Sequence, residues 1–496
     1  MTRQLTLADF IEGIGGWHPE GMEMPVCPIL DSRKAGPGTV FCAFKGEQVD
    51  GHDYVADAFA RGAVAALVDR DVAVEATSLD MRGPAHPEHF VTPLLIRVSN
   101  VLQALQSAAR SWRLQLSPRV VAITGSVGKT TTKELVTRVL ENRYRVLYST
   151  GSYNNEIGLP LTLLQLTGNH ERVVLEMGMY VRGDIKLLAE IAHPHVGIIT
   201  NVESVHTERA GSIENVALGK QELVEALPPA PDGIAILNYD DRRVRAMAEH
   251  TQAKVFFYGL SSQADLWADE VESLGLEGIR VRLHYGQDQL YVKVPLLGRH
   301  SAQTVLRAAA IGLVEGLDWQ DIVEGLRAPA TQLRLMAVPG PHDSLVLDDT
   351  YNASPPSVLA ALNLMKDLQI SNGRPFTRKI AVLGDMLELG DYEESGHFKV
   401  GCRAANVVQE LVAVGELARH IARGAELCGM RPEHIHLVAD SEAATALLCQ
   451  ILQPNDLILV KGSRAMKMET IVAALAALRD DAACAAAHPV SQEDLS

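Results

Sequence analysis

The segment "RVVAITGSVGKTTTKELV" (residues 119–136) constrains the fold of this chain more than any other stretch. An apolar run ends in a glycine-bracketed turn, and the turn is followed by Lys129 and by a helical pattern that begins near Thr131. A buried strand, a tight turn and a helix in this order direct backbone N–H groups at an anion. We therefore predict a parallel α/β sheet with a phosphate-binding loop at the carboxyl end of one strand.

This loop departs from the usual phosphate-binding motif at one position. That motif has a glycine five residues before the Gly-Lys pair, where this chain has Ile123. Lys129 is expected to reach the outer phosphates of a nucleotide, and the Thr130 hydroxyl is expected to ligate magnesium. The shorter loop predicts a variant class of ATPase. The residues predicted to contact ATP here are Gly125, Ser126, Gly128, Lys129, Thr130 and Thr131.

The pattern of strands and helices divides the chain into three domains. A length of 496 residues is too great for a single core. Residues 1–113 show short apolar strands broken by glycines, which predicts a mixed α/β domain, and Pro118 lies in the linker that follows. Residues 119–329 and 330–480 alternate apolar runs with helical stretches, which predicts a central ATPase-like parallel sheet and a C-terminal Rossmann-like domain. Residues 481–496 are expected to form a mobile tail.

Charge and composition exclude several classes of partner. The net charge of -16 opposes binding to nucleic acid or to an anionic membrane. No apolar stretch is long enough to cross a bilayer, and the N-terminal "MTRQLTLADFIEGIGG" lacks the apolar core of a signal peptide. The 6 cysteines are scattered without metal-binding spacing, so unpaired thiols in a reducing compartment are expected. We therefore expect a cytoplasmic protein, acting as a monomer.

Three further polar side chains follow central strands, at the sheet edge where ligands collect. Glu176 ends the run "RVVLEM" and suits a magnesium ligand, although a carboxylate there could equally cap a helix or remain solvated. His206 follows "VGIIT", where a histidine is more often a satisfied core or surface residue than a ligand. Lys220 lies in the helical "NVALGKQEL", where a solvated lysine is the ordinary interpretation. These residues alone leave the three roles open.

Longer motifs in the chain resemble those of the Mur ligase superfamily, the ATP-dependent amide-forming enzymes of peptidoglycan synthesis. The resemblance spans about residues 28–475. Its most specific segments are "SYNNEIGLPLTLL" (152–164), "LGRHS" (297–301), "LDDTYNASP" (347–355), "LGDMLELG" (383–390) and "VKGSRAMKME" (460–469). The N-terminal "DSRKAGPGTVFCAFKGEQVDGHDYVADAFARGA" (31–63) is similar to a UDP-substrate domain of this superfamily. Long motifs in a fixed order make chance agreement implausible.

The resemblance is to the branch that joins D-alanyl-D-alanine to UDP-N-acetylmuramoyl-tripeptide. It implies that the tripeptide carboxylate is first converted to an acyl phosphate by ATP, and that the dipeptide amine then displaces phosphate. It also implies that the first domain holds the UDP substrate, the central domain ATP with two magnesium ions, and the last domain the dipeptide. The segment "RAPATQLR" (327–334) is the expected hinge between the last two domains.

The same resemblance implies roles for individual residues. Lys129, Glu176, His206 and Lys220 are the implied catalytic residues, and Thr130, Glu176 and His206 the implied magnesium ligands. Lys220 matches a position at which carbon dioxide converts a lysine into a carbamate, a further magnesium ligand. Arg334 and Asp349 match positions that contact ATP from the last domain. The implied substrate-binding residues are Ser32, Arg33, Asn154, Asn155, Asp385, Glu388, Lys461, Ser463 and Arg464.

Two positions depart from the family pattern. Ser301 and Thr304 stand where the family often has asparagines near the nucleotide, so the adenine contacts are expected to be weaker or rebuilt. The nearest alternative is another ligase of the superfamily that adds a different amino acid. A second alternative is an ATPase switch that hydrolyses ATP without ligation. A third is a degenerate relative with a scaffold role, which only these two changes favour.

Overall fold

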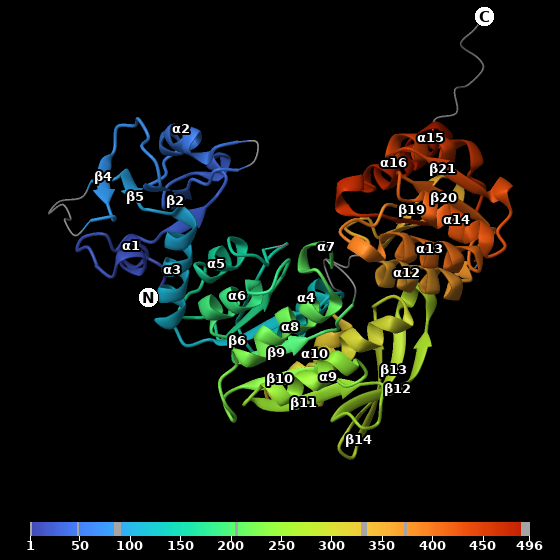
Figure 1. Cartoon of the computed structure of the whole chain (residues 1–496), viewed down its shortest axis with the longest axis horizontal. Coiled ribbons are helices and arrows are strands. Elements are labelled where there is room, and N and C mark those ends of the chain that lie inside the picture. The colour runs from blue at the N-terminus through green and yellow to red at the C-terminus, as the bar shows by residue number, and fades with distance from the viewer. Residues whose placement is uncertain are drawn as a thin grey trace, which may run out of the picture.

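The computed structural model describes residues 2–46, 49–83, 91–151, 153–203, 207–328, 335–371 and 374–487. These residues form three α/β units in a row, with the N-terminal and C-terminal units at opposite ends of the molecule (Figure 1). We call them the first, central and C-terminal units. Each has its own main sheet, which confirms the predicted α/β class with three domains.

The first unit is built on a five-stranded parallel sheet in the order β1-β2-β3-β5-β4. Its helices α1 and α3 pack against each other, and α3 continues into the linker to the central unit. The segments predicted as strands, "TVFCAFKG", "AVAALV" and "PLLIRV", contain β2, β3 and β5. The elements are β1 (Cys27–Ile29), β2 (Thr39–Cys42), β3 (Ala65–Val68), β4 (Thr77–Asp80), β5 (Leu94–Arg97), α1 (Leu7–Gly15), α2 (Val55–Ala60) and α3 (Val101–Leu114).

The central unit contains a nine-stranded sheet in the order β14-β13-β12-β11-β10-β9-β6-β8-β7. The pairs from β7 to β12 are parallel, and β13 and β14 extend the sheet in antiparallel fashion. This extension was not predicted, because its strands alternate buried and exposed residues instead of forming continuous apolar runs. The strands are β6 (Arg119–Thr124), β7 (Val146–Tyr148), β8 (Arg172–Glu176), β9 (Val196–Ile199), β10 (Ile234–Asn238), β11 (Lys254–Gly259), β12 (Leu266–Ser273), β13 (Ile279–Tyr285) and β14 (Asp288–Val294).

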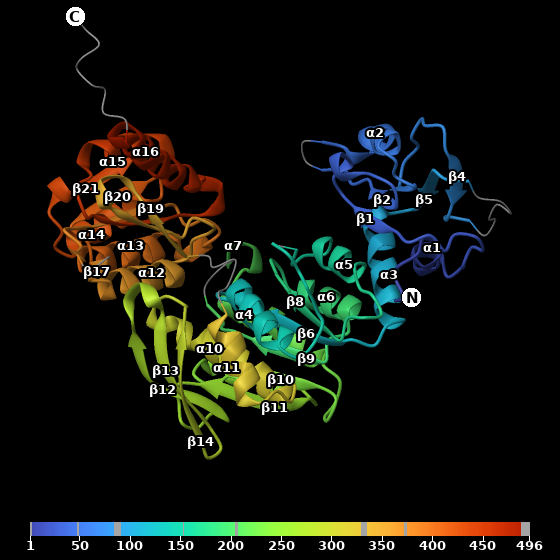
Figure 2. The same ribbon diagram turned by 180° about the vertical axis from the view of Figure 1, so that it is seen from behind.

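Helices cover both faces of the central sheet. Figure 1 shows α5, α6 and α8 in front of the sheet, and Figure 2 shows α4, α10 and α11 on the opposite face. Helix α3 packs against α5 and α6, so the first and central units share one hydrophobic core. The helices are α4 (Lys129–Glu141), α5 (Gly158–Leu163), α6 (Asp184–Ala192), α7 (Thr207–Ala210), α8 (Ile213–Glu225), α9 (Arg242–Ala246), α10 (Ala302–Val314) and α11 (Trp319–Arg327).

The C-terminal unit has a six-stranded sheet in the order β15-β16-β22-β19-β20-β21. All pairs are parallel except β15 with β16, in agreement with the alternation of apolar runs and helical stretches predicted for residues 330–480. The strands are β15 (Met336–Pro339), β16 (Leu345–Asp348), β19 (Lys379–Gly384), β20 (Glu410–Val414), β21 (Ile435–Val438) and β22 (Leu457–Lys461). The helices are α12 (Pro355–Asp367), α13 (Glu393–Ala405), α14 (Arg419–Leu427), α15 (Ser441–Ile451) and α16 (Glu469–Ala487).

The expectation of unpaired cysteines is wrong for Cys402 and Cys428, which form a disulfide between α13 and the end of α14. The physical reason is the close approach of these two helices. A Cβ added at Gly401 would lie 2.0 Å from the carbonyl oxygen of Ile421, and one at Gly424 would lie 2.3 Å from that of Phe398. Glycine backbones therefore bring the two cysteine Cα atoms to 5.1 Å, within the usual disulfide range.

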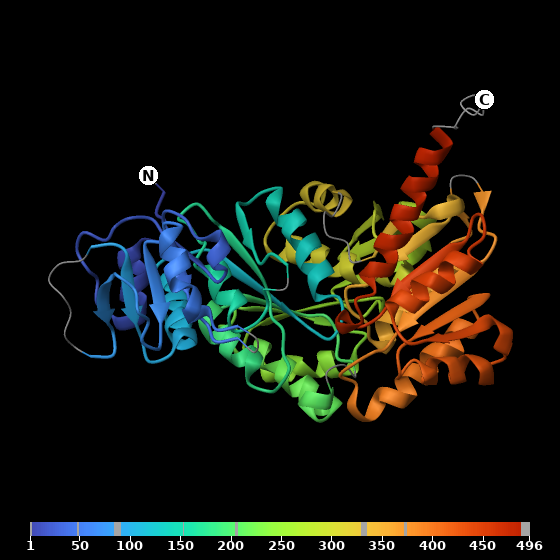
Figure 3. The ribbon, with the colours of Figure 1, turned by 90° about the horizontal axis from the view of Figure 1, so that it is seen from above.

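The last helix also differs from expectation. Helix α16 continues to Ala487, into the segment 481–496 that was expected to be a mobile tail. The alanine-rich run "DDAACAAA" has high helix propensity, which explains the extension. Figure 3 shows this helix projecting from the C-terminal unit. No helix among the described residues combines the length and the apolar character needed to span a membrane.

Candidate active site

The loop between β6 and α4 directs the N-terminus of α4 toward a cleft. Gly128 is the N-cap of α4 with φ 85°, a left-handed conformation that favours glycine. A Cβ at Gly125 would lie 1.8 Å from Thr200 Oγ1, so only glycine fits there against the end of β9. Ile123, which replaces the usual first glycine, is completely buried in β6. The missing glycine therefore shortens the loop without removing the free N–H groups of the helix.

Polar contacts pin this loop to the segment that follows β9. The Val127 N–H donates to Asn201 Oδ1 at 2.9 Å, and the Glu203 N–H donates to Ser126 Oγ at 2.9 Å. Lys129 folds back over the loop, where its Nζ donates to the Gly125 carbonyl at 2.8 Å. The ammonium group therefore lies beside the N–H groups that would receive phosphate.

Glu176 ends β8 close to the loop, and it is 2% exposed. The Thr130 hydroxyl donates to one carboxylate oxygen at 2.8 Å, and Asn154 Nδ2 donates to the other at 2.9 Å. Within the described ranges no lysine or arginine forms an ion pair with it, and it caps no helix there. A buried carboxylate is costly unless it is paired or bound to metal. A hydroxyl beside a carboxylate is also the hard oxygen donor set that magnesium prefers.

Lys220 is 2% exposed on α8, so its interpretation as a solvated helix residue is wrong. The pattern of α8 does not predict this, because α8 packs against other elements, α6 among them, only in the tertiary fold. Burial, followed by the positive charge of Lys129, holds the pKa of Lys220 well below its usual range. A lysine in this environment favours the neutral amine.

A cleft of about 780 Å³ lies between the central and C-terminal units. It brings together residues that are far apart in the sequence. The predicted site residues on its central side are Ser126, Gly128 and Thr131, together with Ser301 and Thr304, and those on its C-terminal side are Asp349, Glu388, Lys461, Ser463 and Arg464. The phosphate loop and the C-terminal unit therefore both line this cleft.

Asp349 and Lys461 form a buried ion pair at one side of the cleft. Lys461 Nζ lies 2.8 Å from Asp349 Oδ2 and also donates to the Asn352 carbonyl at 2.8 Å. Lys461 is 2% exposed, so its ammonium group serves to hold the segment around Asp349. Lys461 also lines the cleft, and its expected contact with the dipeptide stays a prediction.

The segment 385–389 reaches the cleft through Glu388 and is fixed from behind by hydrogen bonds. Asp385 is 7% exposed and does not line the cleft, because its carboxylate accepts from the Ala418 N–H at 2.7 Å. The Leu387 N–H donates to Ser463 Oγ at 2.9 Å, and the Met386 N–H donates to His397 Nε2 at 2.9 Å. Asp385 thus holds the start of α14, and its expected place beside the dipeptide stays a prediction. Sequence reasoning missed His397 because a histidine in a helix carries no specific signal.

The remaining predicted substrate residues lie elsewhere. Ser32 is buried and Arg33 pairs with Asp31 at 2.8 Å, both in the first unit, which lies far from the C-terminal unit (Figure 1). Asn155 Oδ1 accepts from the Gly158 N–H at 2.9 Å at the start of α5, so this side chain acts as a helix cap. His206, Arg334 and the hinge segment 329–334 lie outside the described residues.

Sequence reasoning also missed Arg307, which lies on α10, is 4% exposed and lines the cleft. The signal available in the sequence is a lone arginine in the apolar helical run "TVLRAAAIG". Arg307 donates to Thr304 Oγ1 at 2.8 Å, which ties it to one of the two positions that depart from the family pattern. Ser301, the other one, donates to the Leu297 carbonyl at 2.7 Å.

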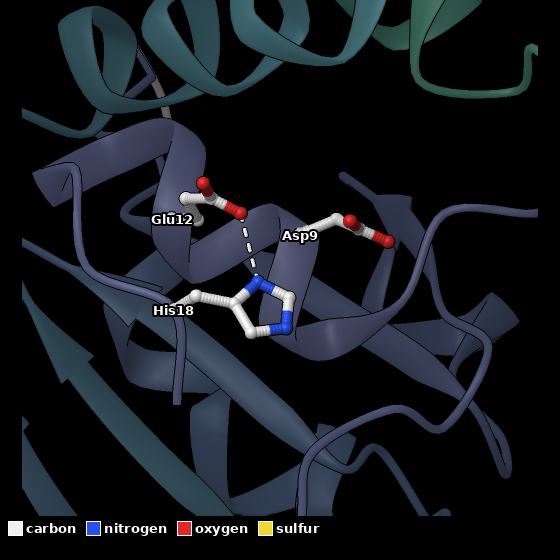
Figure 4. A group of neighbouring side chains, drawn as sticks. All are labelled: Asp9, Glu12 and His18. Carbon is white, nitrogen blue, oxygen red and sulfur yellow. Dashed lines mark hydrogen bonds and ion pairs between the residues drawn. The ribbon is translucent and has the colours of Figure 1, made fainter. Parts of the chain in front are cut away.

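A separate group of possible metal ligands lies on the first unit and consists of Asp9, Glu12 and His18 (Figure 4). Asp9 accepts from the backbone N–H and the hydroxyl of Thr6 in the capping box of α1, and it pairs with Arg3 at 3.5 Å. His18 contacts Glu12 at 2.8 Å. Helix capping and a surface pair account for this group without a metal ion.

Models of the Mur ligase family match three consecutive parts of the chain. The Mur ligase family catalytic domain matches residues 29–113, the Mur ligase middle domain residues 123–312, and the Mur ligase glutamate ligase domain residues 333–464. Among relatives, the UDP-N-acetylmuramoyl-tripeptide–D-alanyl-D-alanine ligase of Bacillus subtilis (strain 168) is 35% identical over 444 residues. The match covers 89% of this chain and 91% of the relative.

Solved structures of the same kind match the whole fold. A crystal structure of MurF from Acinetobacter baumannii superposes with a TM-score of 0.80 at 28% identity, covering 96% of this chain and 99% of that one. MurF ligase from Thermotoga maritima in complex with ADP has a TM-score of 0.74 at 25% identity, covering 92% of this chain and 98% of that one. The similarity thus extends over all three units.

Proposed function

The chain belongs to the Mur ligase family, and we propose that it joins D-alanyl-D-alanine to UDP-N-acetylmuramoyl-tripeptide in the synthesis of peptidoglycan precursors. The observation that carries this proposal is the similarity to a ligase of that name along 89% of the chain at 35% identity. The chain is an ATP-dependent amide ligase, and ADP in a similar structure supports nucleotide binding at the loop before α4.

The reaction needs ATP because a carboxylate and an amine do not condense in water. The γ-phosphoryl group is transferred to the tripeptide carboxylate, which gives an acyl phosphate and ADP. The dipeptide amine attacks the carbonyl carbon, forms the C–N bond, loses a proton and expels phosphate. Positioning and charge stabilisation supply most of the catalysis in phosphoryl transfer. The protein must therefore hold several anions close together.

We propose that the N-terminus of α4 and Lys129 bind the ATP phosphates. The loop already points these N–H groups at the cleft, and the Lys129 ammonium lies 2.8 Å from the Gly125 carbonyl. Ser126 and Thr131 border the same space, and Asp349 faces them from the C-terminal unit. Arg334 is proposed as a further ATP contact by its match to the family.

We propose that Thr130, Glu176 and His206 hold magnesium. Magnesium, when bound, would neutralise phosphate charge in the transition state. The buried Glu176 carboxylate, bonded to the Thr130 hydroxyl at 2.8 Å, supports this proposal. Asn154 holds the second carboxylate oxygen at 2.9 Å and thereby orients the group.

Lys220 is proposed to form a carbamate that assists in metal binding. The neutral amine would attack carbon dioxide, form an N–C bond and release one proton, which leaves an anionic carbamate. The lowered pKa of Lys220 supports this reaction, because only the unprotonated amine has the lone pair that attacks. The change would replace a buried neutral amine by an anion near the proposed magnesium site.

The two acceptor substrates are assigned to opposite units. We propose that the UDP substrate binds the first unit near Ser32 and Arg33, and that the dipeptide binds near Glu388, Ser463 and Arg464. Closure about the segment 327–334 would exclude water from the acyl phosphate. The use of ATP supports a cytoplasmic site of action, and we propose that the enzyme acts as a monomer.

Phosphate release by the purified protein tests this function. ATP and magnesium would be supplied with the UDP-linked tripeptide alone, with D-alanyl-D-alanine alone and with both, and the product mass would be measured. The expected result is release that requires both acceptors and a product heavier by one dipeptide. Release with ATP alone would favour an ATPase switch, and product with a single amino acid would favour another ligase of the family.

A further inference from the structure

Arg307 is a buried cation that the ligase mechanism outlined above does not use. It lies on α10, is 4% exposed and lines the cleft beside the phosphate loop. An ideal Cβ placed on Gly128 would lie 3.2 Å from Arg307 Nη2. The guanidinium group therefore packs directly against the residue that caps the N-terminus of α4.

The hydrogen bonds of Arg307 leave its charge without an acidic partner. Nη2 donates to the Thr304 hydroxyl at 2.8 Å, and Nη1 lies 3.5 Å from the Tyr258 hydroxyl. Nε is buried without a hydrogen-bond partner, and in the described part of the chain no aspartate or glutamate forms an ion pair with this arginine. A guanidinium group has five N–H donors, so most of its capacity remains unused.

Burying a charge without a counterion is unfavourable, and the described residues supply no counterion here. The phosphate loop beside Arg307 adds further positive potential, because it contains Lys129 and the N-terminus of α4. This side of the cleft is thus built to receive a polar, anionic ligand.

We propose that Arg307 binds the phosphate chain of the nucleotide, as a second cation of the ATP site beside Lys129. The proposal rests on ATP binding at this loop and adds a residue that donates from α10. Thr304 is the positioning residue, because its hydroxyl holds the guanidinium group against Gly128. The contact would rebuild part of what the Ser301 and Thr304 replacements remove from this region.

Nucleotide affinity of the full-length protein tests the proposal. Isothermal titration calorimetry with magnesium present would compare ATP, ADP, AMP and adenosine for the unaltered protein and for Arg307→Met. We expect Arg307→Met to weaken ATP and ADP binding by about 10- to 100-fold, as for loss of charge-assisted hydrogen bonds, and to leave adenosine binding unchanged. Thr304→Ala should weaken the same two ligands by a smaller factor.

Thermal unfolding without nucleotide separates a binding role from a structural one. If Arg307 serves a ligand, Arg307→Met removes an uncompensated buried charge, so its Tm should equal or exceed that of the unaltered protein. The matched control is Arg119→Gln, since Arg119 pairs with the buried Glu315 at 2.7 Å at the opposite end of β6. This control should lower the Tm and leave nucleotide affinity unchanged.

Other outcomes would overturn the proposal. Unchanged ATP affinity in Arg307→Met, equal weakening of adenosine and ATP, or a lowered Tm with unchanged affinity would make Arg307 a structural residue. If Arg307→Met does not fold, Arg307→Lys decides in its place: it should retain part of the ATP affinity, and full retention would contradict the need for the guanidinium donors. Failure of the unaltered protein to bind ATP would instead overturn the proposed ligase function.

Discussion

The two sides of the cleft use charged side chains in different ways. On the central side, Glu176 and Arg307 are buried without a partner of opposite charge among the described residues. On the C-terminal side, Lys461 and Asp349 are paired at 2.8 Å, and the Asp385 carboxylate is bonded to a backbone N–H. The central side therefore holds its charges available for ligands, and the C-terminal side uses them to fix its own shape.

We therefore expect mutations of the central-side charges to affect binding, and mutations of the C-terminal-side pair to affect folding. A buried charge without a partner costs stability, so its removal is tolerated by the fold and is felt in function. A buried pair is different, because removal of one partner leaves the other uncompensated. Four predictions test this contrast, beginning with the largest expected effect.

Lys461→Met should lower the free energy of unfolding by about 3–5 kcal/mol, because it leaves the Asp349 carboxylate beside an apolar side chain. Urea denaturation checks this value. The double variant Lys461→Met with Asp349→Asn should recover part of the loss, since the group that Lys461 pairs with is then uncharged as well. A single variant as stable as the unaltered protein would show that the C-terminal side does not depend on this pair.

Lys129→Ala should reduce kcat for phosphate release by about 10²- to 10³-fold, because it removes a cation from the phosphate site. The Tm without nucleotide should change little, since the Lys129 ammonium group donates to two carbonyl groups of its own loop. Lys186→Ala, on the exposed face of α6, is the matched control and should retain full activity. Retained activity in Lys129→Ala would contradict the proposed role of the loop.

Glu176→Gln should raise the magnesium concentration needed for half-maximal activity by about 10- to 100-fold. The amide retains the size of the side chain and loses the negative charge that attracts the ion. The Tm in the absence of magnesium should not fall, because a buried uncompensated carboxylate has been removed. An unchanged magnesium requirement would contradict the proposed metal site and would make Glu176 a residue that only supports the fold.

The smallest effect is a pH dependence that arises from His397. Its Nδ1–H donates to the Glu393 carbonyl at 2.6 Å and its Nε2 accepts from the Met386 N–H at 2.9 Å, so the neutral ring is bound on both sides. Burial lowers the pKa of His397 from its usual value of 6.5. The unfolded chain then binds more protons, so this contribution is present above pH 6.5 and is lost as the pH falls through the lowered pKa.

The free energy of unfolding, measured from pH 8 to pH 5, should therefore decrease toward acid, and the decrease should be shallower in His397→Gln. An identical slope in His397→Gln and in the unaltered protein would show that His397 is not among the groups responsible.

Several features of the protein could be predicted from the sequence alone. The phosphate loop, the buried parallel strands and the α/β class follow from local patterns, because strand burial requires continuous apolar runs and the tight turn requires Gly125 and Gly128. The long motifs also placed the chain in its family. His206 and Arg334 remain predictions, since they lie outside the described residues.

Other features were decided only by the tertiary structure. Lys220 and Arg307 occur in ordinary helical patterns, and their burial depends on helices and loops that come from distant parts of the chain. The Cys402–Cys428 disulfide and the Lys461–Asp349 pair likewise join distant residues. Burial and pairing decide how much a charged side chain destabilises the fold and whether it is available to a ligand. Both depend on packed neighbours from distant parts of the chain, which no local stretch of sequence contains.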